Sequence, residues 1–255
     1  MRQISYARSD VGRVRENNED NYYLCGHFRE DVTELRSAAT CDTTYVPTLY
    51  AVCDGMGGES HGETASLIAV RHLHPYFYRD VKSGAEAEIR AANTEICEEI
   101  KKRNCSRMGT TLASLYIDED KAVACNIGDS RIYLLRRELL TQLSTDHDEA
   151  AGLVRMGMLT KEQARTDKRR HVLTQYLGFP PEEMTLEPFF EEVSLLPGDR
   201  FLVCSDGVTD MLDDDRIAEI LLREKEASQA ADGLIEASLK AGGADNATVI
   251  VVDLG

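Results

Sequence analysis

Four short apolar runs in the sequence each adjoin an aspartate that stands next to a glycine or an asparagine. The runs are residues 49–53, 123–127, 201–204 and 247–252, and the aspartates are Asp54, Asp129, Asp206 and Asp245. Short runs that are apolar on both faces and bounded by turn residues are typical of buried strands. The pattern therefore predicts a sheet whose strand ends carry acidic side chains.

Acidic side chains gathered at one edge of a sheet predict bound cations. Carboxylates that lie close together repel and raise one another's pKa unless cations lie between them. Carboxylate oxygens suit Mg²⁺ or Mn²⁺, and the glycine-rich turn after Asp54 leaves room beside its carboxylate for a metal ion, a phosphate or both. Taken alone, Asp54 could equally cap a helix that begins near Glu59. The recurrence of the pattern favours the cation site.

A charged loop precedes the second predicted strand and places an arginine close to two acids. Arg15, Glu19 and Asp20 stand four and five residues apart. On a bent loop they could meet at one point, where the guanidinium offers a planar fork for a phosphate and the acids face metal-bound water. The alternative is a charged loop that is merely solvated.

The order of the remaining segments favours two antiparallel sheets. Strands are predicted at residues 3–9, 20–25, 108–117, 121–127, 131–135, 186–193, 201–205 and 247–253, and helices at residues 62–79, 85–103, 214–224 and 226–241. Residues 27–48 are polar and are expected to form an irregular surface excursion. Strands joined by short turns favour antiparallel pairing. The predicted fold is α+β, a four-layer α-β-β-α sandwich of two antiparallel sheets flanked by helices. The glycines at 55–58 do not follow the pattern of a dinucleotide site.

Charge and cysteine content narrow the class of protein. The 255 residues allow one large domain or two small ones, and their net charge of −16 argues against binding to nucleic acid. The sequence contains no apolar stretch of the length that a membrane helix needs. Seven cysteines, an odd number, include three inside predicted strands, which is typical of a reduced, cytoplasmic protein.

Residues 146–171 read as a separate helical region ending in a basic cluster. Thr160 is expected to cap a short helix that runs through Ala164. The cluster at residues 168–171, Lys-Arg-Arg-His, could meet a phosphorylated or acidic substrate, or it could balance nearby acids. Both alternatives stay open from the sequence.

Seven motifs, taken together, resemble the metal-dependent serine/threonine protein phosphatases of the PP2C (PPM) type in their bacterial form. They are Arg-Glu-Asn-Asn-Glu-Asp at 15–20, Asp-Gly-Met-Gly-Gly at 54–58, Met-Gly-Thr-Thr at 108–111, Gly-Asp-Ser-Arg at 128–131, Leu-Thr at 173–174 with Leu-Gly at 177–178, Ser-Asp-Gly at 205–207 and Asp-Asn-Ala-Thr at 245–248. A single Asp-Gly pair is weak support, whereas the whole series in the family's order spans nearly the entire chain.

The resemblance implies a dinuclear Mg²⁺ or Mn²⁺ centre between the two sheets. It makes Asp54 the bridge between the metals, with Asp206 and Asp245 completing the shell of one of them. The Gly55 carbonyl would bind the other metal, and Glu19 and Asp20 would hold its waters. Asp129, with Asp206, would form a weaker third site, and Arg15 would bind the substrate phosphate.

The implied reaction is hydrolysis of phosphoserine and phosphothreonine in proteins, with Asp54, Asp206 and Arg15 as the catalytic residues. Two cations about 3.5–4 Å apart can share a water, lower its pKa and clamp the phosphoryl oxygens. The resulting bridging hydroxide would attack phosphorus in line and expel the alkoxide, while Arg15 and the metals stabilise the charge on the equatorial oxygens.

Departures from the family pattern bear on the leaving group and on the substrate. Met56 stands where many relatives carry a histidine that is proposed to protonate the leaving group, and methionine cannot do so. His61 and His147 are possible substitutes. Gln175 stands where relatives often carry arginine, and the 27–48 excursion is longer than usual. Both could alter the preferred substrate.

The resemblance further implies a single catalytic domain over residues 1–255, with a flap at about 146–171. Its expected partners are phosphorylated proteins, including a serine/threonine protein kinase, and it is expected to be a cytoplasmic monomer that binds neither nucleic acid nor a membrane. One alternative is a pseudophosphatase that only binds its partner, although every expected ligand position is filled. The other is a phosphatase acting on a small phosphoester.

Overall fold

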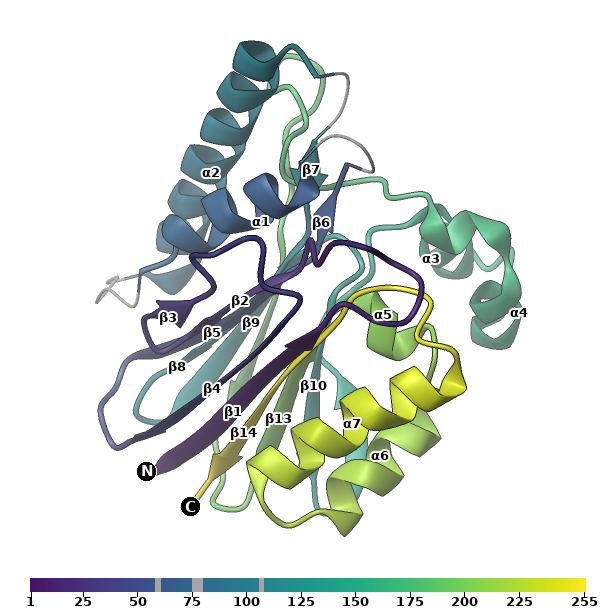
Figure 1. The fold of residues 1–255 in the computed structure, drawn as a ribbon. Coiled ribbons are helices and arrows are strands. Elements are labelled where there is room, and N and C mark those ends of the chain that lie inside the picture. The colour runs from purple at the N-terminus through teal and green to yellow at the C-terminus, as the bar shows by residue number, and fades with distance from the viewer. Residues whose placement is uncertain (58–60, 75–79, 106–107) are drawn as a thin grey trace.

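The computed structural model describes residues 1–57, 61–74, 80–105 and 108–255. Two six-stranded antiparallel sheets stack face to face, with helices on both outer surfaces (Figure 1). In order across the first sheet the strands are β11 (Leu139–Gln142), β10 (Arg131–Arg136), β13 (Arg200–Cys204), β14 (Ala247–Leu254), β1 (Gln3–Asp10) and β4 (Arg36–Thr43). Across the second sheet they are β12 (Phe189–Ser194), β9 (Lys121–Ile127), β8 (Leu112–Ile117), β5 (Thr48–Cys53), β2 (Asn21–Leu24) and β3 (His27–Phe28).

The helices form the two outer layers and a smaller group beside the strand ends. A two-stranded ribbon also joins β6 (Gly55–Met56) to β7 (Gly109–Thr110). The helices are α1 (Gly62–Arg71), α2 (Val81–Arg103), α3 (Glu149–Arg155), α4 (Lys161–Thr166), α5 (Asp206–Thr209), α6 (Asp214–Arg223) and α7 (Ala227–Ala241), with a 3₁₀ turn η1 (Lys168–His171). Helices α1 and α2 cover the second sheet, and α6 and α7 cover the first (Figure 1).

Three apolar clusters hold the four layers together. Between the sheets, Tyr50 and Leu115 of the second sheet pack with Phe201 and Ile250 of the first, and all four are fully buried. Two further clusters lie between each sheet and its helices. Because side chains alternate along a strand, apolar residues on both faces require cover on both faces. This arrangement confirms the predicted α-β-β-α sandwich.

The 27–48 segment is not the irregular excursion that the sequence predicted. Strand β4 occupies residues 36–43 and pairs with all eight residues of β1, from Gln3 opposite Thr43 to Asp10 opposite Arg36. Its side chains alternate between exposed and half-buried and are mostly small, so the apolar signal of a strand is weak. Arg29, in the same segment, is buried and donates to the backbone carbonyls of Asn18 and Glu34.

Two predicted helix boundaries differ from the structure. Helix α2 begins at Val81 rather than Ala85, because Asp80 caps it by accepting a hydrogen bond from the Lys82 amide at 3.1 Å, and Gly84 lies inside the helix. Helix α1 ends at Arg71, and the predicted extension over 75–79 lies outside the described residues. The N-cap of α1 is His61, so Asp54 does not cap this helix.

The other helical predictions agree with the structure. Thr160 caps α4 through a capping box with Gln163, and α6 and α7 lie where the apolar periodicity placed them. Within the described ranges, no helix has both the length and the apolar character needed to cross a membrane.

Candidate metal centre

The ends of strands from both sheets bring the predicted aspartates together. Asp54 follows β5 of the second sheet, Asp206 follows β13 of the first, and Asp245 precedes β14 beside it. Asp129 lies where the chain crosses from β9 in one sheet to β10 in the other. The carboxylates of Asp20, Asp129, Asp206 and Asp245 all act electrostatically on Asp54. Both sheets therefore supply acids to the same site.

Burial and mutual repulsion disfavour the ionised forms of these carboxylates. Burial and the charges of neighbouring aspartates hold the pKa of Asp54 and of Asp129 well above the usual range. Burial, followed by the charges of Asp210 and Asp245, raises the pKa of Asp206 to about 7. A bound cation would relieve this repulsion by favouring the ionised forms.

Asp20 offers the clearest structural test of whether a cation fits here. Its side chain is 1% exposed, and its Oδ2 accepts a hydrogen bond from Ser205 Oγ at 2.8 Å. Its Oδ1 is buried without a hydrogen-bond partner among the described residues, and burial raises the pKa of Asp20 to about 6. An unpaired buried carboxylate oxygen is costly. The orphaned oxygen and the oxygen-rich donor set fit a hydrated divalent cation.

Gly55 keeps the charged loop close to Asp54. A Cβ built on Gly55 would lie 2.4 Å from the carbonyl oxygens of both Glu19 and Gly62. The backbones of the 11–20 loop and of α1 therefore approach the Asp54 turn more closely than any side chain would allow. The predicted Gly58 of this turn lies outside the described residues.

Asn246 anchors the same loop from the other side, a role that was not predicted from the sequence. Its Nδ2 donates to the carbonyls of Val11 and Asn17 at 2.9 Å each, and its Oδ1 accepts from the Glu19 amide at 2.8 Å. These bonds tie the loop to the start of β14. The neighbouring Asp245 is thereby held beside Arg15, whose Nη2 donates to Asp245 Oδ2 at 2.7 Å.

The loop residues differ in their exposure. The Arg15 side chain is 51% exposed, although it pairs with Asp245. Glu19 is half-buried, and burial together with the charge of Glu63 raises its pKa to about 7. Glu63, in the first turn of α1, was not predicted and adds another acid to this side of the site.

The predicted flap folds as α3, α4 and η1 and is fastened to the first sheet. The Arg131 guanidinium forms a bidentate ion pair with Asp146, with its shortest contact at 2.7 Å. Between this segment and the strand ends lies a cavity of about 300 Å³ that reaches Asp129 and Asp206. Lys161 and Arg165 of α4 line its other side. The segment therefore forms a wall of the site.

The two histidines considered as replacements for Met56 occupy different environments. His147 is 7% exposed, and its Nδ1 accepts a hydrogen bond from the Gly128 amide at 3.3 Å. Burial lowers the pKa of His147, and its contact with the Gly128 amide supports the turn that carries Asp129. The exposed His61 lies 3.5 Å from Glu63.

Gln175 Oε1 accepts from the Glu187 amide at 2.7 Å.

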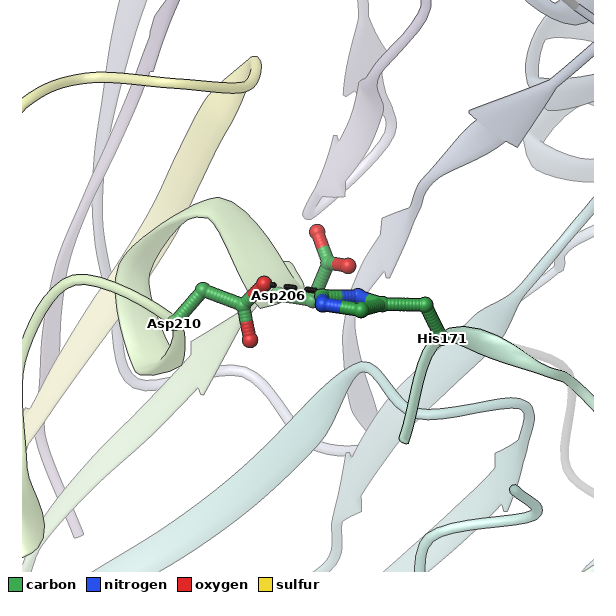
Figure 2. Close-up of side chains that lie close together, drawn as sticks. All are labelled: His171, Asp206 and Asp210. Atoms are coloured by element: carbon green, nitrogen blue, oxygen red, sulfur yellow. Dashed lines mark ion pairs between the residues drawn. The ribbon is translucent and has the colours of Figure 1, made fainter. Parts of the chain in front are cut away.

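Two further residues near the predicted ligand Asp206, His171 and Asp210, were not predicted as metal ligands. His171, Asp206 and Asp210 bring their ligand atoms within 4.8 Å of one another, and Figure 2 shows the His171 ring facing both carboxylates. Arg170 pairs with Asp210 at 2.7 Å, and Arg169 pairs with Asp167 at the same distance. Both arginines of the basic cluster thus balance acids, which was one of its two predicted roles. The four-residue spacing of Asp206 and Asp210 was the available signal for this grouping.

The sequence has close relatives among known proteins. The sequence profile described as Protein phosphatase 2C matches residues 26–241. The chain is 34% identical over 253 residues to serine/threonine protein phosphatase PstP of Mycobacterium tuberculosis, covering 97% of this chain and 44% of that protein. It is 32% identical over 255 residues to serine/threonine phosphatase stp of Listeria monocytogenes, covering 96% and 94%. The chain thus spans less than half of the mycobacterial relative and nearly all of the Listeria one.

Solved structures agree with this likeness. The crystal structure of Mycobacterium tuberculosis PstP/Ppp matches with a TM-score of 0.82 at 34% identity and covers 99% of both chains. The catalytic domain of PstP in complex with two manganese ions matches with a TM-score of 0.80 at 33% identity, covering 100% of this chain and 99% of that one.

Proposed function

Because the chain belongs to the protein phosphatase 2C family, we propose that it is a metal-dependent phosphatase of phosphoserine and phosphothreonine in proteins. The observation that carries this proposal is that carboxylates from both sheets act on Asp54, while Oδ1 of Asp20, one of these acids, is buried without a hydrogen-bond partner among the described residues. Buried carboxylates without enough hydrogen-bond partners lower the stability of a protein, and their oxygens are suitable ligands for divalent cations.

Each residue at the strand ends has a proposed place in the centre. Asp54 would hold both of two Mg²⁺ or Mn²⁺ ions, and Asp206 and Asp245 would be further ligands of one of them. The Gly55 carbonyl would be a ligand of the other ion, and Glu19 and Asp20 would hold its waters. Asp129 and Asp206 would hold a weaker third ion. Two such ions supply a water of lowered pKa and a clamp for the phosphoryl oxygens.

Arg15 supplies the substrate contact. Its guanidinium pairs with Asp245 and is half exposed, so it can exchange this partner for phosphate oxygens at small cost. When Asp245 binds a cation, the cation neutralises part of its negative charge, and the attraction between Asp245 and Arg15 weakens. The planar guanidinium can then donate to two phosphate oxygens and hold the phosphorus atom beside the carboxylates of the centre.

The proposal includes the organisation and setting of the chain. We infer that residues 1–255 act as one monomeric catalytic domain, with residues 146–171 as a flap over the substrate. The proposed substrates are phosphoproteins of the cytoplasm, including a serine/threonine kinase. All seven cysteines are free, which suits a reducing compartment.

Phosphate release from a phosphothreonine peptide, with Mn²⁺ and then with EDTA, tests the proposal. Wild type is expected to release phosphate with Mn²⁺ alone, and Asp206→Asn is expected to lose this activity because a neutral amide is a poor cation ligand. Asp120→Asn, in an exposed turn, is the matched control and retains full activity.

The outcomes separate the alternatives. Phosphate release that persists in EDTA would contradict the proposed metal centre. Phosphate release by Asp206→Asn within a few-fold of the wild-type rate would contradict it as well. A wild type that binds Mn²⁺ but releases no phosphate from peptides would indicate a pseudophosphatase, or a phosphatase of small phosphoesters if a metabolite panel were turned over instead.

A further inference from the structure

Arg29, in the 27–48 segment, is a buried cation without an anionic partner. It is 4% exposed, and within the described part of the chain its guanidinium forms no ion pair with a carboxylate. Its Nη1 donates to the Asp20 carbonyl, and its Nη2 donates to the carbonyls of Asn18 at 3.3 Å and Glu34 at 2.6 Å. A buried charge without an ionic partner is costly. Such an arginine is better explained by the groups that it holds than by a gain in stability.

Asn21 fixes the backbone from which Arg29 extends. Its Oδ1 accepts from the Arg29 amide at 3.0 Å, and its Nδ2 donates to the Arg29 carbonyl at 2.9 Å. Asn21 begins β2, and Arg29 follows the last residue of β3, which pairs with β2. Both residues are buried. The guanidinium is therefore held against the 11–20 loop by a pair of hydrogen-bonded strands.

Three successive carbonyl groups of this loop accept hydrogen bonds from side chains. The carbonyls of Asn18 and Asp20 accept from Arg29. The Glu19 carbonyl between them accepts from Ser66 Oγ at 2.6 Å. Hydrogen bonds from a charged donor are stronger than those from a neutral one, and the planar guanidinium fixes their directions. The backbone of this stretch is therefore held in one orientation, which sets where the Glu19 and Asp20 side chains begin.

A second residue of the 27–48 segment holds the same loop. The Leu35 carbonyl accepts from the Val11 amide at 2.9 Å and from Asn18 Nδ2 at 3.2 Å. The segment thus contacts the loop at its first residue through Leu35 and near its last residues through Arg29. These contacts make the segment a support for the loop.

Glu19 and Asp20 are the residues proposed to hold the waters of the ion beside Gly55. We propose that Arg29 is a positioning residue of the metal centre, which fixes the loop backbone so that both carboxylates face that ion. This inference rests on the proposed function, because the ion beside Gly55 belongs to the proposed centre. It gives the 27–48 segment a role in metal binding, whereas the sequence indicated only an influence on the preferred substrate.

The charge of Arg29 and its contacts predict opposite effects on metal affinity. A positive charge near the centre repels a metal cation, so removing the charge alone would strengthen metal binding. Removing the contacts with the Asn18 and Asp20 carbonyls would release the loop. Loss of a group that orients metal ligands typically costs about 10–100-fold in metal affinity. Weaker metal binding after substitution of Arg29 therefore reports on positioning and not on charge.

Titration calorimetry with Mn²⁺ tests this role at about pH 8, above the pKa values of Glu19 and Asp20. Arg29→Gln is expected to bind Mn²⁺ about tenfold more weakly than wild type, or more weakly still. Arg200→Gln is the matched control. Arg200 is also largely buried and also donates to three backbone carbonyls, but it begins β13, at the end of that strand away from Asp206. It should lower the melting temperature in EDTA and leave the Mn²⁺ affinity unchanged.

Arg29→Lys is the second variant, and it decides the question if Arg29→Gln does not fold. The ammonium keeps the buried charge but lacks the planar fork that reaches two carbonyls of the loop. Arg29→Lys is therefore expected to bind Mn²⁺ more weakly than wild type, by a smaller factor than Arg29→Gln. Circular dichroism at the temperature of the titration shows which variants are folded.

The outcomes separate positioning from stability and from the metal centre itself. Unchanged Mn²⁺ affinity in the folded Arg29 variants, or tighter binding in Arg29→Gln, would overturn the positioning role. An equal loss of affinity in Arg200→Gln would overturn it as well, because the loss would then follow from lowered stability. A wild type that binds no Mn²⁺ would instead overturn the metal centre of the proposed function, and the role of Arg29 with it.

Discussion

At the scale of single residues, the acids of the centre work against the stability of the metal-free fold. Asp54 is surrounded by four other carboxylates that raise its pKa by repulsion as well as by burial. A residue in such surroundings is better explained by ligand binding than by folding.

Asp54→Asn should therefore stabilise the protein in EDTA while abolishing its activity. The amide keeps the shape of the side chain and removes one charge from the cluster, so the melting temperature should rise by about 2–4 °C for each kcal/mol of repulsion relieved. Calorimetric scans with and without Mn²⁺ check this, and the gain from Mn²⁺ should shrink in the variant. A lower melting temperature in EDTA would show that the Asp54 carboxylate supports the fold.

Arg15→Ala should act mainly on substrate binding. The guanidinium is proposed to hold phosphate oxygens in both the ground state and the transition state, so KM should rise about tenfold or more while kcat changes little. Arg15→Lys should recover part of the loss, because an ammonium keeps the charge without the fork. Steady-state kinetics on a phosphopeptide measure both values. Arg13→Ala, two residues away and also exposed, is the control, and an unchanged KM in Arg15→Ala would rule out the contact.

At the scale of elements, the predicted flap is attached to β10 through the contact of Asp146 with Arg131. The Asp146 side chain is 11% exposed and Arg131 is 23% exposed, and their contact is bidentate. Removing one partner of a largely buried ion pair leaves the other charge uncompensated.

Arg131→Gln is expected to lower the free energy of unfolding by about 3 kcal/mol. The double variant Arg131→Gln with Asp146→Asn should recover most of that loss, because neither charge then remains buried alone. Urea unfolding of the single variants and the double variant forms the thermodynamic cycle. A cost below about 0.5 kcal/mol for Arg131→Gln would place the pair among ordinary surface ion pairs.

The elements that could be predicted are those whose apolar pattern is strong. Strands β5, β9, β13 and β14 are apolar on both faces, and their burial determines where they lie. Strand β4 was missed because its half-buried face consists of small side chains, and its pairing with β1 depends on contacts between residues that are far apart in sequence, from Gln3 with Thr43 to Asp10 with Arg36. Strand β4 therefore forms because it pairs with β1 in the assembled sheet, and its own sequence does not indicate a strand.

The same distinction applies to the candidate site. The aspartates at strand ends could be found because each follows or precedes an apolar run. Asn246 and Arg29 donate to backbone carbonyls of the 11–20 loop, and His171 pairs with Asp210 only where residues 146–171 pack beside α5. These contacts depend on tertiary packing, and the local sequence indicates only the four-residue spacing of Asp206 and Asp210.

At the scale of the whole molecule, the metal-free protein should lose stability as pH rises. The pKa values of Asp20, Asp206 and Glu19 are raised from 3.8, 3.8 and 4.5 to about 6, 7 and 7. Between about pH 4 and pH 7 the folded state therefore holds more protons than the unfolded state. The free energy of unfolding then falls with increasing pH.

Melting temperatures measured across this range in EDTA and in Mn²⁺ test the linkage. The EDTA series should fall from pH 5 to pH 7.5, and Mn²⁺ should flatten or reverse the trend, since cations replace the protons that the carboxylates release. A rise with pH in EDTA would mean that the carboxylates are ionised and stabilising without metal.

Strands β1 and β14 lie side by side in the first sheet, although they are the first and last strands of the chain. During synthesis, β1 is made first and cannot pair with β14 until β14 has left the ribosome. Pairing between segments so far apart in sequence forms late, because a long loop must be closed first. Asp245 and the anchor Asn246 arrive in the same final stretch. A nascent chain therefore contains Asp54, Asp129 and Asp206 before Asp245 can join them, and the proposed metal centre cannot form until β14 is available to pair with β1.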